Sequence, residues 1–334
     1  MNSPYIGAPP EISIVVPCFN EESVILETNR RLIGTMTQTG RCFELVYVDD
    51  GSRDHTLTLL TSLQLADARI RVVSLSRNFG HQLAITAGLH HSRGQAVVLI
   101  DADLQDPPEV IPKMIARWRE GYEVVYGTRM SREGETAFKT KTAEWFYRLM
   151  NCISEIPIPL DSGDFRLLDR KAVDVLVSMP ERDRFVRGMV SWVGFRQIAV
   201  PYDRIARRAG ESKYSLFRMV CFAADGILSF SILPVRLATF LGIAVTLGTV
   251  VAAAAIIAFR LSGPFQPGPW LAVLLAVFFV GGVQLTCLGV LGEYLGRIYG
   301  ESKRRPLYVV RETRGFDDPV HDRSRSIAVH ESRS

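Results

Sequence analysis

Cysteine is scarce in this chain, and the few cysteines are not arranged in pairs. The 334 residues include five cysteines, and none has the spacing of a zinc site or of a compact disulfide framework. They are Cys18, Cys42, Cys152, Cys221 and Cys287. Their scatter excludes a small disulfide-stabilised secreted domain and a structural zinc module, and it fits a reducing compartment.

Other familiar signals are also missing. The first predicted strand is followed by Pro17-Cys18-Phe19-Asn20-Glu21 rather than by Gly-x-Gly-x-x-Gly, which excludes a typical dinucleotide-binding dehydrogenase. Residues 1–11 have neither a basic start nor an apolar core, so we expect no export signal. The net charge is only +4, and we expect no nucleic-acid partner. The histidines, among them His81, His90 and His91, lack partners at metal-ligand spacing, so we expect them on helices or on the surface.

Two long apolar runs, residues 237–259 and 270–292, stand near the C-terminal end. Each is long enough to cross a bilayer as a helix, and residues 260–269 between them are rich in glycine and proline. Lysine and arginine are frequent before the first run and after the second, which places both chain ends in the cytoplasm. The sequence therefore predicts a multi-pass protein of the cytoplasmic (inner) membrane; a buried hairpin of a soluble protein is the alternative.

These runs divide the chain into four predicted parts. Residues 1–210 form a cytoplasmic domain, 211–235 an amphipathic segment in the membrane interface, and 236–293 a transmembrane hairpin. Residues 294–334 form a basic cytoplasmic tail, and we expect its charged end to be disordered. For the amphipathic segment, a helix packed on the cytoplasmic domain is the alternative.

The first 130 residues alternate short β-branched runs with longer segments of helical periodicity. The predicted strands are residues 12–16, 44–48, 71–75, 96–100 and 123–126, and the helices between them are residues 21–37, 54–66, 80–91 and 108–120. Further along, we predict strands at 164–168 and 195–201 and helices at 171–179 and 184–193. The strict alternation predicts an α/β fold with a doubly wound, mostly parallel sheet.

Polar residues follow each of the first five predicted strands. The clusters are Pro17–Glu21, Asp49–Ser52, Ser76–Asn78, Asp101–Gln105 and Gly127–Arg129. Parallel strands deliver such loops to one edge of a sheet, where open α/β folds bind their ligands. The sequence therefore predicts a ligand-binding cleft at this edge.

The fourth cluster has the composition of a metal site. Asp101, Asp103 and Gln105 follow a buried apolar strand and present oxygen ligands at alternating positions. Such donors suit Mg²⁺ or Mn²⁺, and a divalent cation suits a diphosphate leaving group. The alternative is an acidic, proline-capped start of the next helix.

Taken jointly, the motifs carry a resemblance. These clusters, together with Asp164-Phe165-Arg166 and Gly210-Glu211-Ser212-Lys213-Tyr214-Ser215, resemble the family 2 inverting glycosyltransferases. They are most similar to the branch that loads a sugar onto a polyprenyl phosphate, which includes dolichyl-phosphate mannose synthases and bacterial bactoprenol glucosyltransferases. The resemblance covers residues 11 to about 305 and implies a GT-A-like nucleotide-sugar-binding domain.

The resemblance implies a set of donor-binding residues. The residues implied to bind the nucleotide sugar are Pro17, Phe19, Asn20, Glu21, Asp49, Asp50, Arg77, Asn78 and Asp101. Asp49 would accept a hydrogen bond from a base nitrogen, which fits both uracil and guanine. For Asp50 the alternative is a cap on the turn that follows it.

The resemblance also implies how the reaction proceeds. Asp103 and Gln105, helped by Asp101, would hold the cation on the donor diphosphate. Arg129 and Lys213 would bind the acceptor phosphate, with ordinary basicity near a membrane as the alternative. A phosphate monoester, with a second pKa of about 6, is already ionised at neutral pH and needs no general base. Asp164 would therefore be either a base or a positioning group.

The implied function is sugar transfer, with UDP-glucose as the favoured donor and undecaprenyl phosphate as the acceptor, for modification of an envelope glycan. Alternatives are a GDP-mannose-dependent mannose synthase, transfer of an N-acetylhexosamine or a modified pentose, and a non-catalytic nucleotide-sugar-binding scaffold. A processive polysaccharide synthase is disfavoured because its Gln-x-x-Arg-Trp motif is missing. Gly292, Gly296 and Gly300 could pack helices in a homo-oligomer. By resemblance alone, a small flippase and a periplasmic transferase would be partners.

Overall fold

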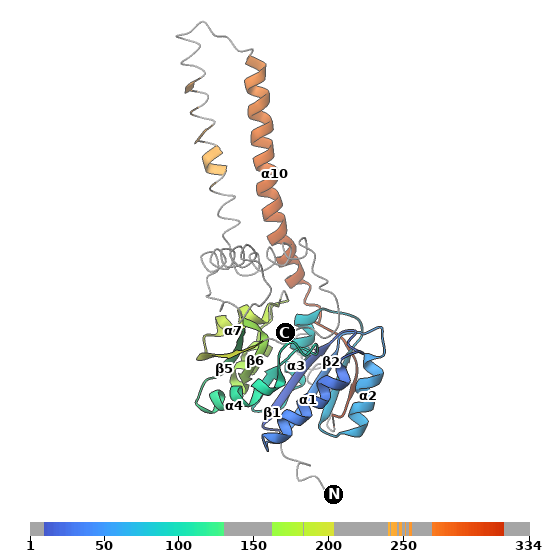
Figure 1. Cartoon of the computed structure of the whole chain (residues 1–334). Coiled ribbons are helices and arrows are strands. Elements are labelled where there is room, and N and C mark those ends of the chain that lie inside the picture. Colours follow the sequence, from blue (N-terminus) through green and yellow to red (C-terminus); the bar gives the residue numbers. More distant parts are fainter. Residues whose placement is uncertain are drawn as a thin grey trace, which may run out of the picture. The chain divides into compact units, whose positions relative to one another are not determined.

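A computed structural model of the chain describes 10–129, 162–182, 184–203, 240, 242–245, 247–248, 251, 254–255 and 269–316 (Figure 1). The chain forms two compact units. The first comprises Met1–Tyr147, Ile156–Lys213 and Pro306–Ser334, and the second comprises Arg148–Glu155 and Tyr214–Arg305. The segment that contains Lys213 and the whole of 211–235 lie outside the described residues.

The first unit is built on a mixed sheet of eight strands in the order β7-β5-β6-β4-β1-β2-β3-β8. The strands are β1 (Ile12–Cys18), β2 (Phe43–Asp49), β3 (Ile70–Leu75), β4 (Ala96–Leu99), β5 (Val124–Arg129), β6 (Ser162–Asp169), β7 (Gln197–Tyr202) and β8 (Val310–Arg314). Strands β6 and β8 run antiparallel to their neighbours, and the other pairs are parallel. The predicted doubly wound, mostly parallel sheet is confirmed.

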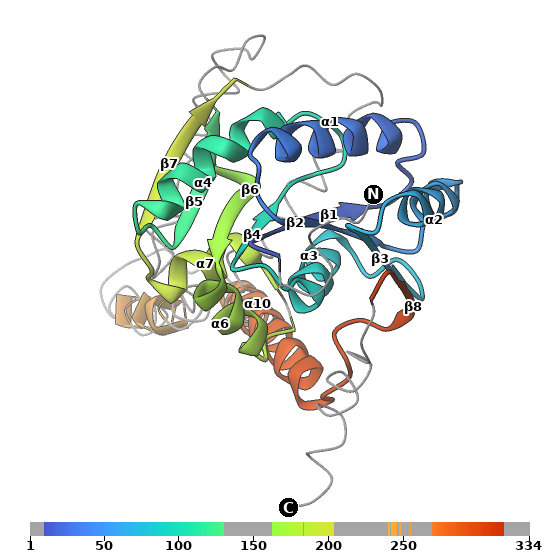
Figure 2. The same cartoon turned by 90° about the horizontal axis from the view of Figure 1, so that it is seen from below.

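Helices cover both faces of the sheet, as Figure 2 shows. They are α1 (Ile25–Gln38), α2 (Thr56–Ala66), α3 (His81–His91), the 3-10 turn η1 (Pro108–Val110), α4 (Ile111–Arg119), α6 (Arg170–Ser178) and α7 (Val186–Val193). Residues of α1 and α4 join Ile12, Ile14 and Val16 in one hydrophobic core. On the other face, α3 approaches so closely that a Cβ on Gly88 would lie 2.1 Å from a methyl of Val15. Because both faces are covered, the central strands are buried throughout and read as continuous apolar runs.

Two details of the sheet differ from the sequence-based expectation. Strand β6 is inserted between β4 and β5, with Leu99 opposite Arg166. Gly127 and Thr128 lie within β5 rather than in a loop after it, and Gly127 leaves room for Tyr202, whose ring a Cβ would approach to 2.6 Å. The carboxyl ends of β1, β2, β3, β4 and β5 nevertheless point to the same edge, as predicted.

Strand β8 was not predicted. It pairs antiparallel with β3, and the residues beside it dock on α3. The hydroxyl of Tyr308 lies 2.7 Å from Nδ1 of His90, and the ring of Phe316 meets the ring of His91 edge-on. A segment that the sequence analysis treated as tail therefore completes the sheet of the first unit.

The described part of the second unit is dominated by α10 (Pro269–Ser302), a helix of 34 residues. By length and composition, Ala276–Ser302 could cross a membrane. Its apolar side chains are exposed rather than buried in protein, as Phe278 at 71% and Leu285 at 72% illustrate. The second predicted run therefore forms a helix, whereas the first lies largely outside the described residues, and two spans are not shown.

Candidate active site

The loops after β1 and β2 are joined by hydrogen bonds that involve Asn20 and Glu21, two of the residues implied to bind the donor. Ser52 Oγ accepts a hydrogen bond from the backbone N–H of Asn20 at 3.0 Å, and Asn20 Oδ1 accepts one from the N–H of Arg53 at 2.8 Å. Thr56 Oγ1 accepts from the N–H of Glu21 at 2.8 Å. Asn20 has a left-handed φ of 57°, which its short amide side chain tolerates. The two loops therefore form one unit at the sheet edge.

Asp49 and Asp50, at the end of β2, are both buried and both bonded within the fold. Asp49 accepts from the N–H of Ser52 at 3.2 Å and from the hydroxyl of Ser74 at 3.2 Å. Asp50 accepts from the N–H groups of Phe79 and Gly80 at 2.7 and 2.9 Å. Burial raises the pKa of Asp50, although these two hydrogen bonds oppose the rise. Asp50 thus anchors the residues before α3. It caps the loop after β3 rather than the turn that follows Asp50 in the chain.

The loops after β2 and β3 touch at Gly51. This residue has a φ of +67°, and a Cβ there would lie 2.5 Å from the carbonyl carbon of Arg77 and 2.7 Å from the nitrogen of Asn78. Both the left-handed backbone and the close approach require glycine. Arg77 itself is exposed and stacks on Phe79, with 4.0 Å between its guanidinium carbon and the ring centroid.

Gly51→Ala should lower the free energy of unfolding by at least about 2 kcal/mol, because the left-handed backbone and the clash both oppose a Cβ. Gly34, in α1, is a matched control, since an added Cβ would meet nothing within 4 Å. Gly34→Ala should raise the free energy of unfolding by about 0.5–1 kcal/mol. Denaturant unfolding followed by tryptophan fluorescence checks both values, and equal effects of the two changes would contradict the close approach.

Asp101 and Asp164 come together at this edge, with His81 between them. Nε2 of His81 lies 3.5 Å from Oδ1 of Asp101 and 3.3 Å from Oδ2 of Asp164. Arg187 binds Asp164 from the other side, with Nε 2.8 Å from Oδ1 and Nη2 3.3 Å from Oδ2. Asp101 is partly exposed, whereas the side chain of Asp164 is only 10% exposed. The sequence analysis selected the two aspartates and missed His81 and Arg187.

The two carboxylates have opposite pKa shifts. Burial raises the pKa of Asp101 to about 6; His81 opposes that rise, and the charges of Asp164, Asp106 and Asp103 add to it. Burial would also raise the pKa of Asp164, but its hydrogen bond with His81 and its ion pair with Arg187 hold it well below its ordinary value. Asp164 is therefore ionised and fully engaged, which makes it a poor proton acceptor.

The loop that carries Asp103 and Gln105 has the donors for a divalent cation. Leu104 between them has a φ of 60°, and Asp103 Oδ1 accepts from the N–H of Gln105 at 3.1 Å. Within the described residues, no group of three or more His, Cys, Asp or Glu side chains is arranged to hold a metal ion. Mg²⁺ commonly uses one or two carboxylates and takes its remaining ligands from substrate phosphates and water. The carboxylates of Asp103, Asp106 and Asp164 add to the effect of burial on the pKa of Asp101, and this excess of negative charge fits such a cation.

The remaining predicted residues are placed as follows. Pro17 is buried in β1, Phe19 is 40% exposed, and Asn78 is exposed in the loop after β3. Strand β5 ends at Arg129, so its backbone reaches the expected edge. The side chain of Arg129 and all of Lys213 lie outside what the structure describes.

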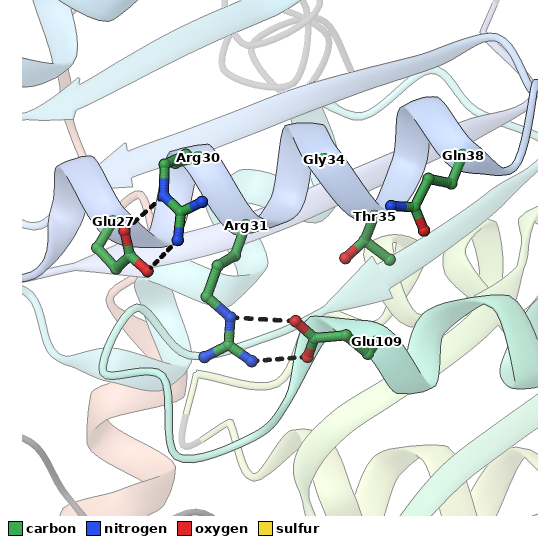
Figure 3. A pocket seen from close by; sticks show the side chains of 7 residues that line it. All are labelled: Glu27, Arg30, Arg31, Gly34, Thr35, Gln38 and Glu109. Atoms are coloured by element: carbon green, nitrogen blue, oxygen red, sulfur yellow. Dashed lines mark hydrogen bonds and ion pairs between the residues drawn. The ribbon is translucent and has the colours of Figure 1, made fainter.

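A separate hollow of about 360 Å³ lies along α1 (Figure 3). It is lined by Glu27, Arg30, Arg31, Gly34, Thr35, Gln38 and Glu109. Arg30 pairs with Glu27 and Arg31 with Glu109, each at 2.6 Å. The charged side chains are thus matched within the hollow, and the hollow includes none of the predicted site residues.

The chain is similar in sequence to known proteins over most of its length. Residues 13–177 match the family described as glycosyl transferase family 2. The chain is 47% identical to the uncharacterized glycosyltransferase YkcC of Bacillus subtilis (strain 168), over 92% of this chain and 95% of that protein. It is 41% identical to the bactoprenol glucosyl transferase of Shigella phage SfV, over 90% of this chain and 98% of that protein.

Among solved structures, similarity extends to glucosyl-3-phosphoglycerate synthase from Mycobacterium tuberculosis in complex with Mn²⁺, UDP-glucose and phosphoglyceric acid. The overlap covers 66% of this chain and 78% of that chain at 21% identity, with a TM-score of 0.44. The sequence relatives are much closer and match nearly their whole length. On that similarity, the chain belongs to glycosyl transferase family 2.

Proposed function

We propose that this protein transfers a sugar from a nucleotide sugar, with UDP-glucose favoured, to polyprenyl phosphate, with inversion at the anomeric carbon. The observation that carries this proposal is the 41% identity to a bactoprenol glucosyl transferase over 98% of that protein's length. The match includes far more than the nucleotide-binding sheet, since it covers 90% of this chain. A polyprenyl phosphate acceptor therefore fits both the unit with the sheet and the unit with the apolar helix α10.

On the donor side, Asp103 and Gln105, with Asp101, would hold Mg²⁺ or Mn²⁺ against the diphosphate. When bound, the cation stabilises the negative charge that builds on the departing nucleoside diphosphate. The linked loops after β1, β2 and β3 would hold the nucleoside, with Phe19 exposed for contact and Asp49 near the base. Asp50 supports this pocket indirectly, because it fixes the loop that begins α3.

On the acceptor side, Arg129 and Lys213 would bind the lipid phosphate. The acceptor oxygen is already ionised at neutral pH, so attack on the sugar needs no general base. Asp164 accordingly serves as a positioning group, a role supported by its bonds to Arg187 and His81. Helix α10 would cross the cytoplasmic membrane, and a hairpin with the preceding apolar run would keep the site beside the inner leaflet.

An assay of the purified protein in detergent tests the proposal. The assay contains a short polyprenyl phosphate, Mg²⁺ or Mn²⁺, and a panel of UDP and GDP sugars. Mass spectrometry should find one lipid-linked hexose, from UDP-glucose. EDTA should lower turnover by at least about 10²-fold, because the leaving diphosphate loses its main electrostatic partner, and excess Mg²⁺ should restore it.

If the product forms from GDP-mannose or from another sugar nucleotide instead, the proposed type of reaction stands but the proposed donor is wrong. Full turnover in EDTA would remove the metal from the proposal. No lipid-linked product from any donor, with metal supplied, would overturn the assignment as an enzyme and favour a nucleotide-sugar-binding scaffold.

A further inference from the structure

The position of His81 is fixed by the backbone at the start of α3. It is the first residue of α3 and follows Gly80, whose φ is 102°. The carboxylate of Asp50 holds the N–H groups of Phe79 and Gly80, immediately before it. The start of α3, and with it the imidazole of His81, is thereby tied to the end of β2.

Of the two aspartates that His81 approaches, Asp101 follows the end of β4 and Asp164 lies in the neighbouring strand β6. Leu99 of β4 is paired with Arg166 of β6, and these strands run in opposite directions. Asp101 lies two residues after Leu99, and Asp164 lies two residues before Arg166. The register therefore places both residues at the same level beyond the Leu99–Arg166 pair.

We propose that His81 is a positioning residue, which bridges Asp101 on the donor side and Asp164 on the acceptor side and so fixes the distance between the two halves of the site. This inference rests on the proposed function. Two carboxylates at this range repel each other, and a ring nitrogen 3.3 and 3.5 Å from them provides a common partner. Arg187 completes the arrangement, because it holds Asp164 from the opposite side.

Helix α7, which carries Arg187, is joined to the same end of α3. Its first residue, Val186, donates its N–H to Oε1 of Gln82 at 2.9 Å. His81 and Gln82, which are consecutive residues, thus connect α3 to the loop after β4, to β6 and to α7. A change at His81 should accordingly alter the relative placement of reactants rather than the affinity for either one.

Steady-state kinetics of His81→Ala and His81→Gln separate this role from a purely structural one. His81→Ala should lower kcat by about 10- to 100-fold, because small errors in placement cost this much, while KM for the nucleotide sugar stays within about twofold. In His81→Gln the side-chain amide can still donate at the reach of Nε2, so kcat should recover in large part. His91→Gln, at the other end of α3, is the matched control and should retain kcat.

A double-mutant cycle tests the partner. The losses in kcat from His81→Ala and Asp164→Asn should be clearly less than multiplicative, because each change breaks the same bridge. Unfolding midpoints within a few degrees of wild type would show that the fold is kept. Wild-type kcat in His81→Ala, or fully multiplicative losses, would overturn the bridging role alone; absence of any product from the wild-type protein would overturn the proposed function and this inference with it.

Discussion

Asp103→Ala should lower kcat/KM for the nucleotide sugar by about 10²–10³-fold, the usual cost of losing one group that stabilises developing charge. Asp103 is well suited to this test because it lies on the loop after β4, where its carboxylate accepts a hydrogen bond from the N–H of Gln105. Asp101 is a less direct probe, because its replacement also removes a partner of His81. The measurement is turnover across a Mn²⁺ titration, since a lost ligand should also raise the metal concentration needed for half activity.

The control for this change is Asp174→Ala. Asp174 is an exposed carboxylate on α6, 3.8 Å from Arg170 and 68% exposed, and its loss should leave turnover and the Mn²⁺ requirement unchanged. An Asp103→Ala protein that keeps both full turnover and the wild-type Mn²⁺ requirement would show that the donor diphosphate is held elsewhere.

Ending the chain at Arg305 should lower the unfolding midpoint by about 10 °C, which corresponds to a loss of about 3–5 kcal/mol for a domain of this size. The truncation removes β8 and leaves the edge of β3 unpaired. It also removes Tyr308 from His90 and Phe316 from His91 and from Arg71, whose guanidinium carbon lies 4.9 Å from the centroid of the Phe316 ring. An unpaired edge strand promotes association between chains, so thermal unfolding and size-exclusion chromatography in detergent are the measurements.

A chain that ends at Phe316 is the matched control for this truncation. It removes 18 residues and keeps β8 together with both ring contacts. Its unfolding midpoint and its elution should match those of the full chain. If the two truncated chains behave alike, strand β8 contributes nothing to the stability of the sheet.

Local patterns were sufficient to predict most elements of the first unit. The apolar runs at β1, β2, β3 and β4 are buried on both faces, and such runs are recognisable without knowledge of their partners. The place of β6 between β4 and β5 could not be predicted, because pairing depends on contacts between residues far apart in the chain. The sequence Val-Arg-Glu-Thr-Arg of β8 reads as a charged tail, and only its partner β3 makes it a strand.

For the candidate site too, residues marked by a local pattern were predictable, whereas residues placed by distant contacts were not. Asp101 and Asp103 stand out because they end an apolar run, and the direction of β4 then places them at the sheet edge. His81 has no such signal, since its partners Asp101 and Asp164 are distant in sequence and come together only through the antiparallel pairing of β4 and β6. Arg187 lies in an arginine-rich stretch whose function no local pattern indicates. A rule that judges a histidine by its neighbours in sequence therefore misses this one.

The place of β8 in the chain also determines when the sheet can be completed during synthesis. The ribosome makes β1 to β7 first, then the apolar segment that ends in α10, and only then the five residues of β8. Every nascent chain therefore carries an open β3 edge until α10 has been made, and unpaired edges are prone to misassembly during that period. Closure of this sheet is a late event that reports completion of α10, so a chain arrested within that helix keeps the edge of β3 open.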